Sequence, residues 1–184
     1  HLSTRRQRQM CIRDRWFPAL RYTAPVPLIL PGPLALTAPI GRGGMGMVWR
    51  GVFEPLGMPV AVKVMHSRDP RVLATFHNEI RAVAGLDHPN IVTVHHQGRI
   101  PEEVAAASGG QLRAGALYLV MELVEGGSIR SRCGRLRWPA IRTVLMSLLA
   151  ALAHAHSRGV IHRDIKPGNV LIGRRSTIGR VRLT

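Results

Sequence analysis

Residues 162–169 read His162-Arg163-Asp164-Ile165-Lys166-Pro167-Gly168-Asn169, a polar segment between two short apolar stretches, 160–162 and 170–172. We expect both stretches to be strands and the segment to be the loop between them. The loop brings a carboxylate, an ammonium group and a neutral amide close together in sequence. Taken alone, it could also be an ordinary tight connection with His162 packed in the core.

Upstream, the spacing Gly41-x-Gly43-x-x-Gly46 follows an apolar stretch, and residues 47–52 after it read as a returning strand. This pattern predicts a hairpin with a glycine tip. In a dinucleotide-binding fold, the glycines open a helix and an acidic residue follows about 20 residues later. Here a strand follows, and Lys63 stands at about that distance. A Walker P-loop is excluded because Gly-Lys-Ser/Thr is missing.

The segment 59–65 alternates with a period of two, which places Ala61, Lys63 and Met65 on one face of a strand and three valines on the other. Asp69-Pro70 then predicts the start of a helix that runs to about residue 86. Its apolar stripe includes Glu79, and a buried carboxylate needs a cationic partner. Spacing alone equally allows Ile80 in the stripe, with Glu79 at its solvated edge.

Later segments complete the expected arrangement. Residues 91–97 and 116–121 read as strands, 98–115 as a long loop, and 181–184 as a further strand. Residues 139–158 predict an amphipathic helix that ends before Gly159. Its expected inward residues are Ile141, Val144, Leu145, Leu148, Leu149 and Leu152.

Taken together and in this order, the glycine loop, Val60-Ala61-Val62-Lys63, Glu79, His162-Arg163-Asp164 and Asn169 resemble the signature set of protein kinases. The sequence around these motifs most resembles the bacterial serine/threonine kinases of eukaryotic type, and the resemblance spans residues 41–184. It implies an α+β, two-lobed fold: an N-lobe with an antiparallel β-sheet and one helix (34–121), a hinge (122–127) and the first part of a mainly helical C-lobe (128–184). Residues 1–33 are expected to be a leader and a Pro-rich stretch outside the domain.

The resemblance also implies roles for individual residues in ATP-dependent phosphorylation of Ser/Thr hydroxyls. Lys63 would contact the phosphates and pair with Glu79, which favours the in-stripe alternative. Asp164 would accept the hydroxyl proton, Lys166 would neutralise charge on the γ-phosphate, and Asn169 would bind Mg²⁺. The nucleotide would be bound by Ile40, Gly41, Gly43, Gly44, Met45, Gly46, Val48, Ala61, Lys63, Met121, Glu122 and Val124.

The net charge of +16 would also suit a nucleic-acid binder. Residues 24–128 are neutral, however, and residues 129–184 hold twelve basic residues against one acidic residue. Because aromatic residues make up only 4% of the chain and the late arginines are scattered, nucleic-acid binding is the less favoured alternative.

Cys11 and Cys133 are too few and too far apart in sequence for a disulfide framework, which favours a cytoplasmic setting. The apolar stretch 24–40 contains five prolines, so we expect no membrane-spanning helix there. Membrane attachment of a full-length protein is left open.

A second magnesium-binding element, Asp-Phe-Gly, is expected directly after Thr184, beyond the last residue of the sequence. Without that Asp, we expect no useful kinase activity from residues 1–184. The alternatives are therefore an incomplete kinase domain that binds ATP, Mg²⁺ and a protein substrate, and an inactive nucleotide-binding pseudokinase or truncated product.

Overall fold

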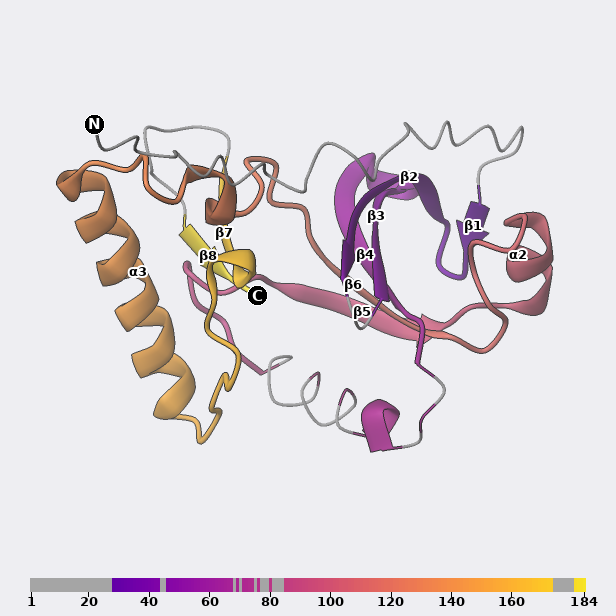
Figure 1. The fold of residues 1–184 in the computed structure, drawn as a ribbon. Coiled ribbons are helices and arrows are strands. Elements are labelled where there is room, and N and C mark those ends of the chain that lie inside the picture. The colour runs from indigo at the N-terminus through magenta and orange to yellow at the C-terminus, as the bar shows by residue number, and fades with distance from the viewer. Residues whose placement is uncertain are drawn as a thin grey trace, which may run out of the picture.

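The structure is a computed structural model, and it describes residues 28–43, 46–67, 69, 71–74, 76, 80, 85–173 and 181–184. Among these residues, a curled antiparallel sheet forms one part of the molecule, and a long helix with a small two-stranded sheet forms the other (Figure 1). This arrangement confirms the expected partial, kinase-like α+β fold.

Within the described residues, the large sheet has six strands in the order β1-β2-β3-β4-β6-β5. Their bounds are β1 Leu28–Leu30, β2 Leu34–Gly43, β3 Gly46–Phe53, β4 Met58–Met65, β5 Val94–Arg99 and β6 Leu117–Glu122. The predicted glycine hairpin is confirmed, since β2 and β3 pair up to Gly43 and Gly46. The sheet also includes β1, so part of the stretch that sequence analysis placed outside the domain pairs with β2.

One face of the sheet carries the main core of the N-terminal part. Val60, Val62 and Val64 of β4 pack there with the fully buried Trp49 of β3, as the alternation predicted. The opposite face carries a smaller cluster, in which Met65 packs with Phe76 and Ile80, two residues of the predicted helix. Residues 71–74, 76 and 80 are helical, and Glu79 lies outside the described residues.

The prediction of a long loop over residues 98–115 is wrong in detail. Strand β5 begins at Val94 and continues to Arg99, and a short helix, α2 (Glu102–Ala107), follows it. Val104 of α2 is buried against the main core. Sequence analysis missed α2 because its Ala-rich composition has no apolar period, and only one of its six residues is buried.

The C-terminal part contains η2 (Ile129–Arg132), α3 (Trp138–His156), η3 (Pro167–Asn169), β7 (Val170–Ile172) and β8 (Val181–Leu183). The predicted end of α3 is confirmed by Gly159, which has a φ of 73°. The prediction of a strand at residues 160–162 is wrong, because β7 pairs with β8 and not with those residues. The polar loop therefore joins α3 to β7.

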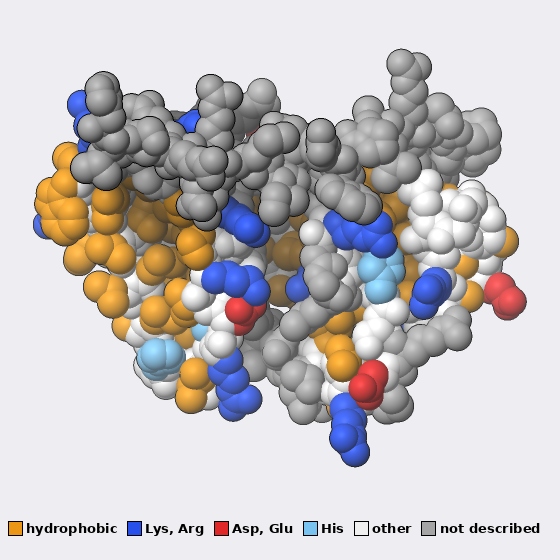
Figure 2. Space-filling view, in the orientation of Figure 1, with side chains coloured by type: hydrophobic (Ala, Val, Ile, Leu, Met, Phe, Trp, Pro, Cys, Tyr) orange, Lys and Arg blue, Asp and Glu red, His pale blue; other side chains and the backbone are white. Residues whose placement is uncertain are grey.

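The buried face of α3 is narrower than its sequence suggested. Val144, Ala151 and Ala155 are buried, whereas Leu145 and Leu149 are 46% and 60% exposed, which corrects two of the expected inward residues. An apolar surface over α3 is visible in Figure 2. Among the described residues, α3 is the one helix long and apolar enough to cross a membrane, which is weak evidence for a span. The Pro-rich stretch contributes strands β1 and β2.

Candidate active site

Asp164 lies at the centre of the polar loop, where two side chains donate hydrogen bonds to one of its oxygens. Lys166 Nζ is 2.6 Å from Asp164 Oδ2, and Asn169 Nδ2 is 3.0 Å from the same atom. Asn169 Nδ2 also donates to the backbone oxygen of Asp164 at 2.8 Å. The three residues that the sequence singled out are therefore in direct contact, and the second oxygen of Asp164 points to no donor within the described residues.

These contacts lower the pKa of Asp164. The largest cause is the hydrogen bond from Lys166, followed by the hydrogen bond from Asn169, while desolvation acts in the opposite direction. The side chains of Lys166 and Asp164 are 56% and 53% exposed, so the ion pair adds little to stability. Its effect is to keep Asp164 ionised as an acceptor.

We expect Lys166→Met to raise the pKa of Asp164, because the strongest stabiliser of the carboxylate is removed. A ¹³C NMR titration of the carboxyl group would measure this pKa. Asn169→Ala should raise it by a smaller amount. An unchanged pKa in Lys166→Met, or a larger rise in Asn169→Ala, would contradict this assignment of causes.

The loop is held in shape by contacts with β8 and its flank. His162 Nδ1 accepts a hydrogen bond from the backbone N–H of Asp164 at 3.2 Å, so Nε2 carries the proton and donates to Thr184 O at 2.7 Å. Thr184 in turn donates its N–H to Asn169 O at 3.0 Å. Arg163 has a φ of 60°, a left-handed conformation that is unusual for arginine and is sustained by these contacts. His162 thus acts as a brace for the loop.

The predicted nucleotide-binding residues of the sheet share one face. Val48 on β3 lies opposite Lys63 on β4, and Lys63 lies opposite Leu119 on β6. In the next row, Ala61 lies opposite Met121. Paired residues point to the same side of a sheet, so the register brings Val48, Ala61, Lys63 and Met121 together. Since Ala61 is small, this face can receive a flat ring.

The rest of the predicted loop is only partly described. Gly41 lies opposite Val48, Ile40 is 51% exposed beside it, and Gly43 and Gly46 close the hairpin. A Cβ built on Gly46 would overlap the carbonyl oxygen of Val64, so this position requires glycine for strand packing. The predictions for Gly44 and Met45 fall outside the described residues.

Lys63 lies where the helix covers the sheet. Its Nζ is 6.0 Å from the centroid of the Phe76 ring, at the outer limit of a cation–π contact. The predicted partner, Glu79, is outside the described residues, so the Lys63–Glu79 pair stays a prediction.

The expected hinge leaves β6 at Glu122 and leads to η2, and its end contacts β7. The N–H of Glu122 donates to Thr93 O at 2.9 Å, so this donor is already engaged. Within the described part of the chain, neither backbone group of Val124 has a hydrogen-bond partner, which suits the predicted contact with adenine. Gly127 then accepts the N–H of Ile172 on β7 at 2.9 Å.

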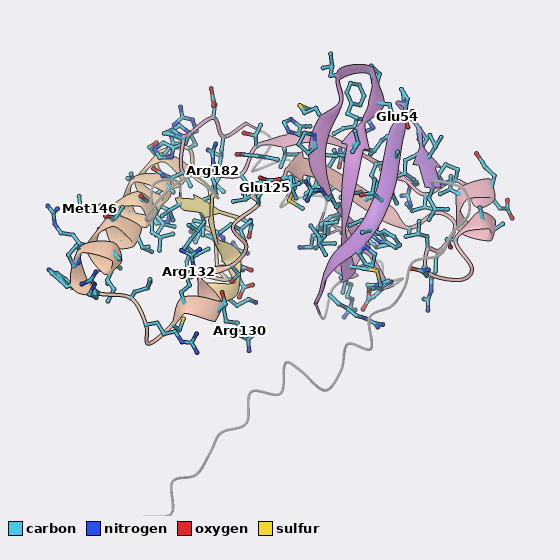
Figure 3. All side chains as sticks on the ribbon, turned by 90° about the horizontal axis from the view of Figure 1, so that it is seen from above. Glu54, Glu125, Arg130, Arg132, Met146 and Arg182 are labelled. Atoms are coloured by element: carbon cyan, nitrogen blue, oxygen red, sulfur yellow. The ribbon has the colours of Figure 1, made fainter. Side chains whose placement is uncertain are left out.

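Arg182 on β8 is a residue that sequence analysis missed. Its guanidinium pairs with Glu122 Oε1 at 3.0 Å and donates to the backbone oxygens of Pro89 at 2.5 Å and Ile91 at 3.1 Å. The side chains of Arg182 and Glu122 are 12% and 25% exposed. One side chain therefore joins β8, the hinge and the segment before β5, and Figure 3 labels it. The sequence signal that could have identified Arg182 is a charged residue within the otherwise apolar strand predicted at 181–184.

Asn169 is the predicted metal ligand. Because its Nδ2 faces Asp164, its Oδ1 is the oxygen left for a cation. Across the described residues, no group of three or more His, Cys, Asp or Glu side chains could hold a metal ion by themselves. Magnesium in proteins often takes only one or two side-chain oxygens and completes its shell with phosphate and water, so one amide oxygen fits a phosphate-bound Mg²⁺.

Comparison with known proteins adds independent information. Residues 34–184 match the protein kinase domain. The chain is 40% identical over 165 residues to serine/threonine-protein kinase PknA of Mycobacterium tuberculosis, and the aligned region covers 86% of this chain and 36% of that protein. It is 39% identical over 145 residues to probable serine/threonine-protein kinase PknB of Bifidobacterium longum, which covers 76% of this chain and 20% of that protein. The chain spans about a third or less of the length of these curated relatives.

Proposed function

Because the chain belongs to the protein kinase family through residues 34–184, we propose that it binds ATP with Mg²⁺ and serves phosphoryl transfer to Ser or Thr hydroxyls of proteins. The observation that carries this proposal is the ionised Asp164, hydrogen-bonded to Lys166 and Asn169 on a loop braced by His162. Bacterial relatives named as serine/threonine kinases support Ser and Thr as the residues that accept the phosphoryl group.

Each polar group has a task that follows from its position. Lys63, on the sheet face with Val48 and Ala61, would bind the phosphates while the apolar residues contact adenine. Asp164 would accept a hydrogen bond from the substrate hydroxyl and then its proton. A carboxylate with a lowered pKa is a weak base, which suffices because the transition state of phosphoryl transfer is loose and needs orientation more than deprotonation. Lys166 would neutralise charge beside it.

The donor set fits the two cofactors. Bound Mg²⁺ would neutralise the charge of the phosphates, and Asn169 Oδ1 would be one of the ligands of the ion. The Val48, Ala61 and Met121 side chains form an apolar surface next to the cationic Lys63, which matches a nucleotide with a flat base and charged phosphates.

The direct test measures nucleotide binding on the whole chain. We expect MgATP to raise the melting temperature, and Lys63→Met to weaken the affinity by about 10- to 150-fold, since a hydrogen bond from a charged group is worth about 1.5–3 kcal/mol. Arg142→Met, which also removes one exposed positive charge, is the control and should bind normally. A chain with no MgATP response that bound nucleic acid in a salt-sensitive manner would contradict the proposal.

A second readout separates a kinase from a protein that only binds nucleotide. Phosphate transfer to a Ser/Thr substrate, lost in Asp164→Asn while MgATP binding is retained, would support catalysis. The sequence-based expectation that residues 1–184 lack useful activity stays a prediction, which is why binding and transfer are measured separately. A cytoplasmic setting is likewise still a prediction, and Cys133 is a free thiol.

A further inference from the structure

The C-terminal part of the chain carries an unusual excess of positive charge. Residues 129–184 contain twelve Lys and Arg residues and one acidic residue, Asp164. Four of these arginines follow the hinge directly, in and just after η2. They are Arg130, Arg132, Arg135 and Arg137. Arg130, Arg135 and Arg137 are exposed, and Arg132 is partly exposed.

A short chain of contacts fixes η2 against the polar loop. Ser128 Oγ accepts the N–H of Arg130 at 3.1 Å and donates to the carbonyl oxygen of Pro167 at 2.7 Å. Ser128 also forms a bridge with Leu171 of β7. Pro167 is three residues after Asp164, so η2 packs directly on the segment that carries the candidate catalytic carboxylate. Figure 3 shows Arg130 and Arg132 on η2, beside β7 and β8.

Unlike Arg50 and Arg182, the described arginines of η2 have no carboxylate partner. Arg50 pairs with Glu125, and Arg182 pairs with Glu122. Among the residues that the structure describes, no carboxylate pairs with Arg130 or Arg132, and the carboxylate of Asp164 is bound by Lys166. Figure 2 shows Lys and Arg side chains gathered around an acidic one between α3 and the sheet. The exposed part of η2 therefore carries positive charge that no described carboxylate compensates.

We propose that Arg130 and Arg132 form a docking surface for acidic side chains that flank the Ser or Thr of a protein substrate. The inference rests on the proposed function and adds a substrate class to it. Exposed guanidinium groups bind carboxylates in a bidentate manner and attract acidic segments before contact. A protein segment is favoured over nucleic acid because the patch adjoins the residue that would receive a hydroxyl proton.

The test uses the full chain and three labelled peptides that contain one Thr flanked by Glu, Gln or Lys residues. Fluorescence anisotropy at low salt should show that the Glu peptide binds about tenfold more tightly than the Gln peptide, and that the Lys peptide binds most weakly. The preference for Glu should decrease as salt is added, because the groups involved are exposed.

Arg130→Glu/Arg132→Glu should remove this preference. The matched control is Arg113→Glu/Arg142→Glu, which makes the same change in net charge at two exposed arginines away from η2. Arg142 precedes the buried Val144 by two residues, so it lies on the opposite face of α3. The control should retain most of the preference. Arg130→Lys provides a milder variant that keeps the charge and should also retain it.

The outcomes separate the two proposals. MgATP binding is measured on the same samples. If the wild-type chain binds MgATP but shows no preference for the Glu peptide, the proposal of a docking surface is wrong and the proposed function stands. The same holds if both double variants lose this preference equally. If an oligonucleotide binds more tightly than the Glu peptide and depends on the same two arginines, the patch is a nucleic-acid site and the inference is overturned. If MgATP does not bind to the wild-type chain, the proposed function itself fails.

Discussion

Arg182→Met is expected to destabilise the chain by about 3 kcal/mol, because it leaves Glu122 as a mostly buried carboxylate without its cation. The variant also removes the donors to the carbonyl oxygens of Pro89 and Ile91. For a chain of this size, a loss of about 3 kcal/mol corresponds to a decrease in melting temperature of about 6–12 °C. Thermal unfolding followed by circular dichroism would measure it.

Two comparisons make this prediction specific. Arg50→Met breaks a similar pair with Glu125, but the two side chains are 45% and 36% exposed, so we expect a cost below about 1 kcal/mol. Arg182→Met/Glu122→Gln should recover part of the lost stability, since the uncompensated charge is removed as well. Equal effects of Arg182→Met and Arg50→Met would show that Arg182 does not join the hinge to β8 as described.

Gly126→Ala is expected to destabilise the chain by about 2–4 kcal/mol and to weaken MgATP binding. A Cβ at this position would overlap the carbonyl oxygen of Ile172, and a backbone atom cannot rotate away as a side chain can. The hinge would have to move off β7, which puts the hydrogen bond from Ile172 N–H to Gly127 O at risk. The predicted adenine contact at Val124 lies two residues away and should shift with it.

Urea denaturation and a nucleotide titration would measure the two effects. The control is Gly85→Ala, because a Cβ on Gly85 meets nothing within 4 Å. We expect its stability to stay within about 0.5 kcal/mol of wild type and its MgATP affinity to be unchanged. A Gly126→Ala variant that behaves like Gly85→Ala would mean that the hinge does not need to approach β7 this closely.

Much of the candidate site was predictable because it depends on local patterns. The alternation in residues 59–65 fixed which side Lys63 takes, since a strand can point its side chains only two ways. The glycine spacing predicted the β2–β3 hairpin, and the close sequence spacing of Asp164, Lys166 and Asn169 placed them in one tight loop. The family resemblance added roles that these patterns alone left open, and Glu79 remains such a case.

Helix α3 shows where local patterns mislead. Its apolar residues cover more than one face, and sequence analysis assigned Leu145 and Leu149 to the inside, although both are exposed. Periodicity identifies apolar positions, but the elements packed against a helix decide which of them are buried. The strand expected at 160–162 failed for a related reason. Strand pairing needs a partner, and β7 finds it in β8, eleven residues further along the chain.

By itself, the sequence determined the β2–β3 hairpin, strand β4 with the side of Lys63, and the chemistry of the polar loop, because each depends on residues close together in the chain. Only the tertiary structure decided that Arg182 joins Glu122 to the segment at Pro89, that His162 braces the loop through Thr184, and that Ser128 ties the start of η2 to Pro167. These contacts join residues that are 22 to 93 positions apart. No local spacing encodes such pairs, because they form only when separate elements pack together.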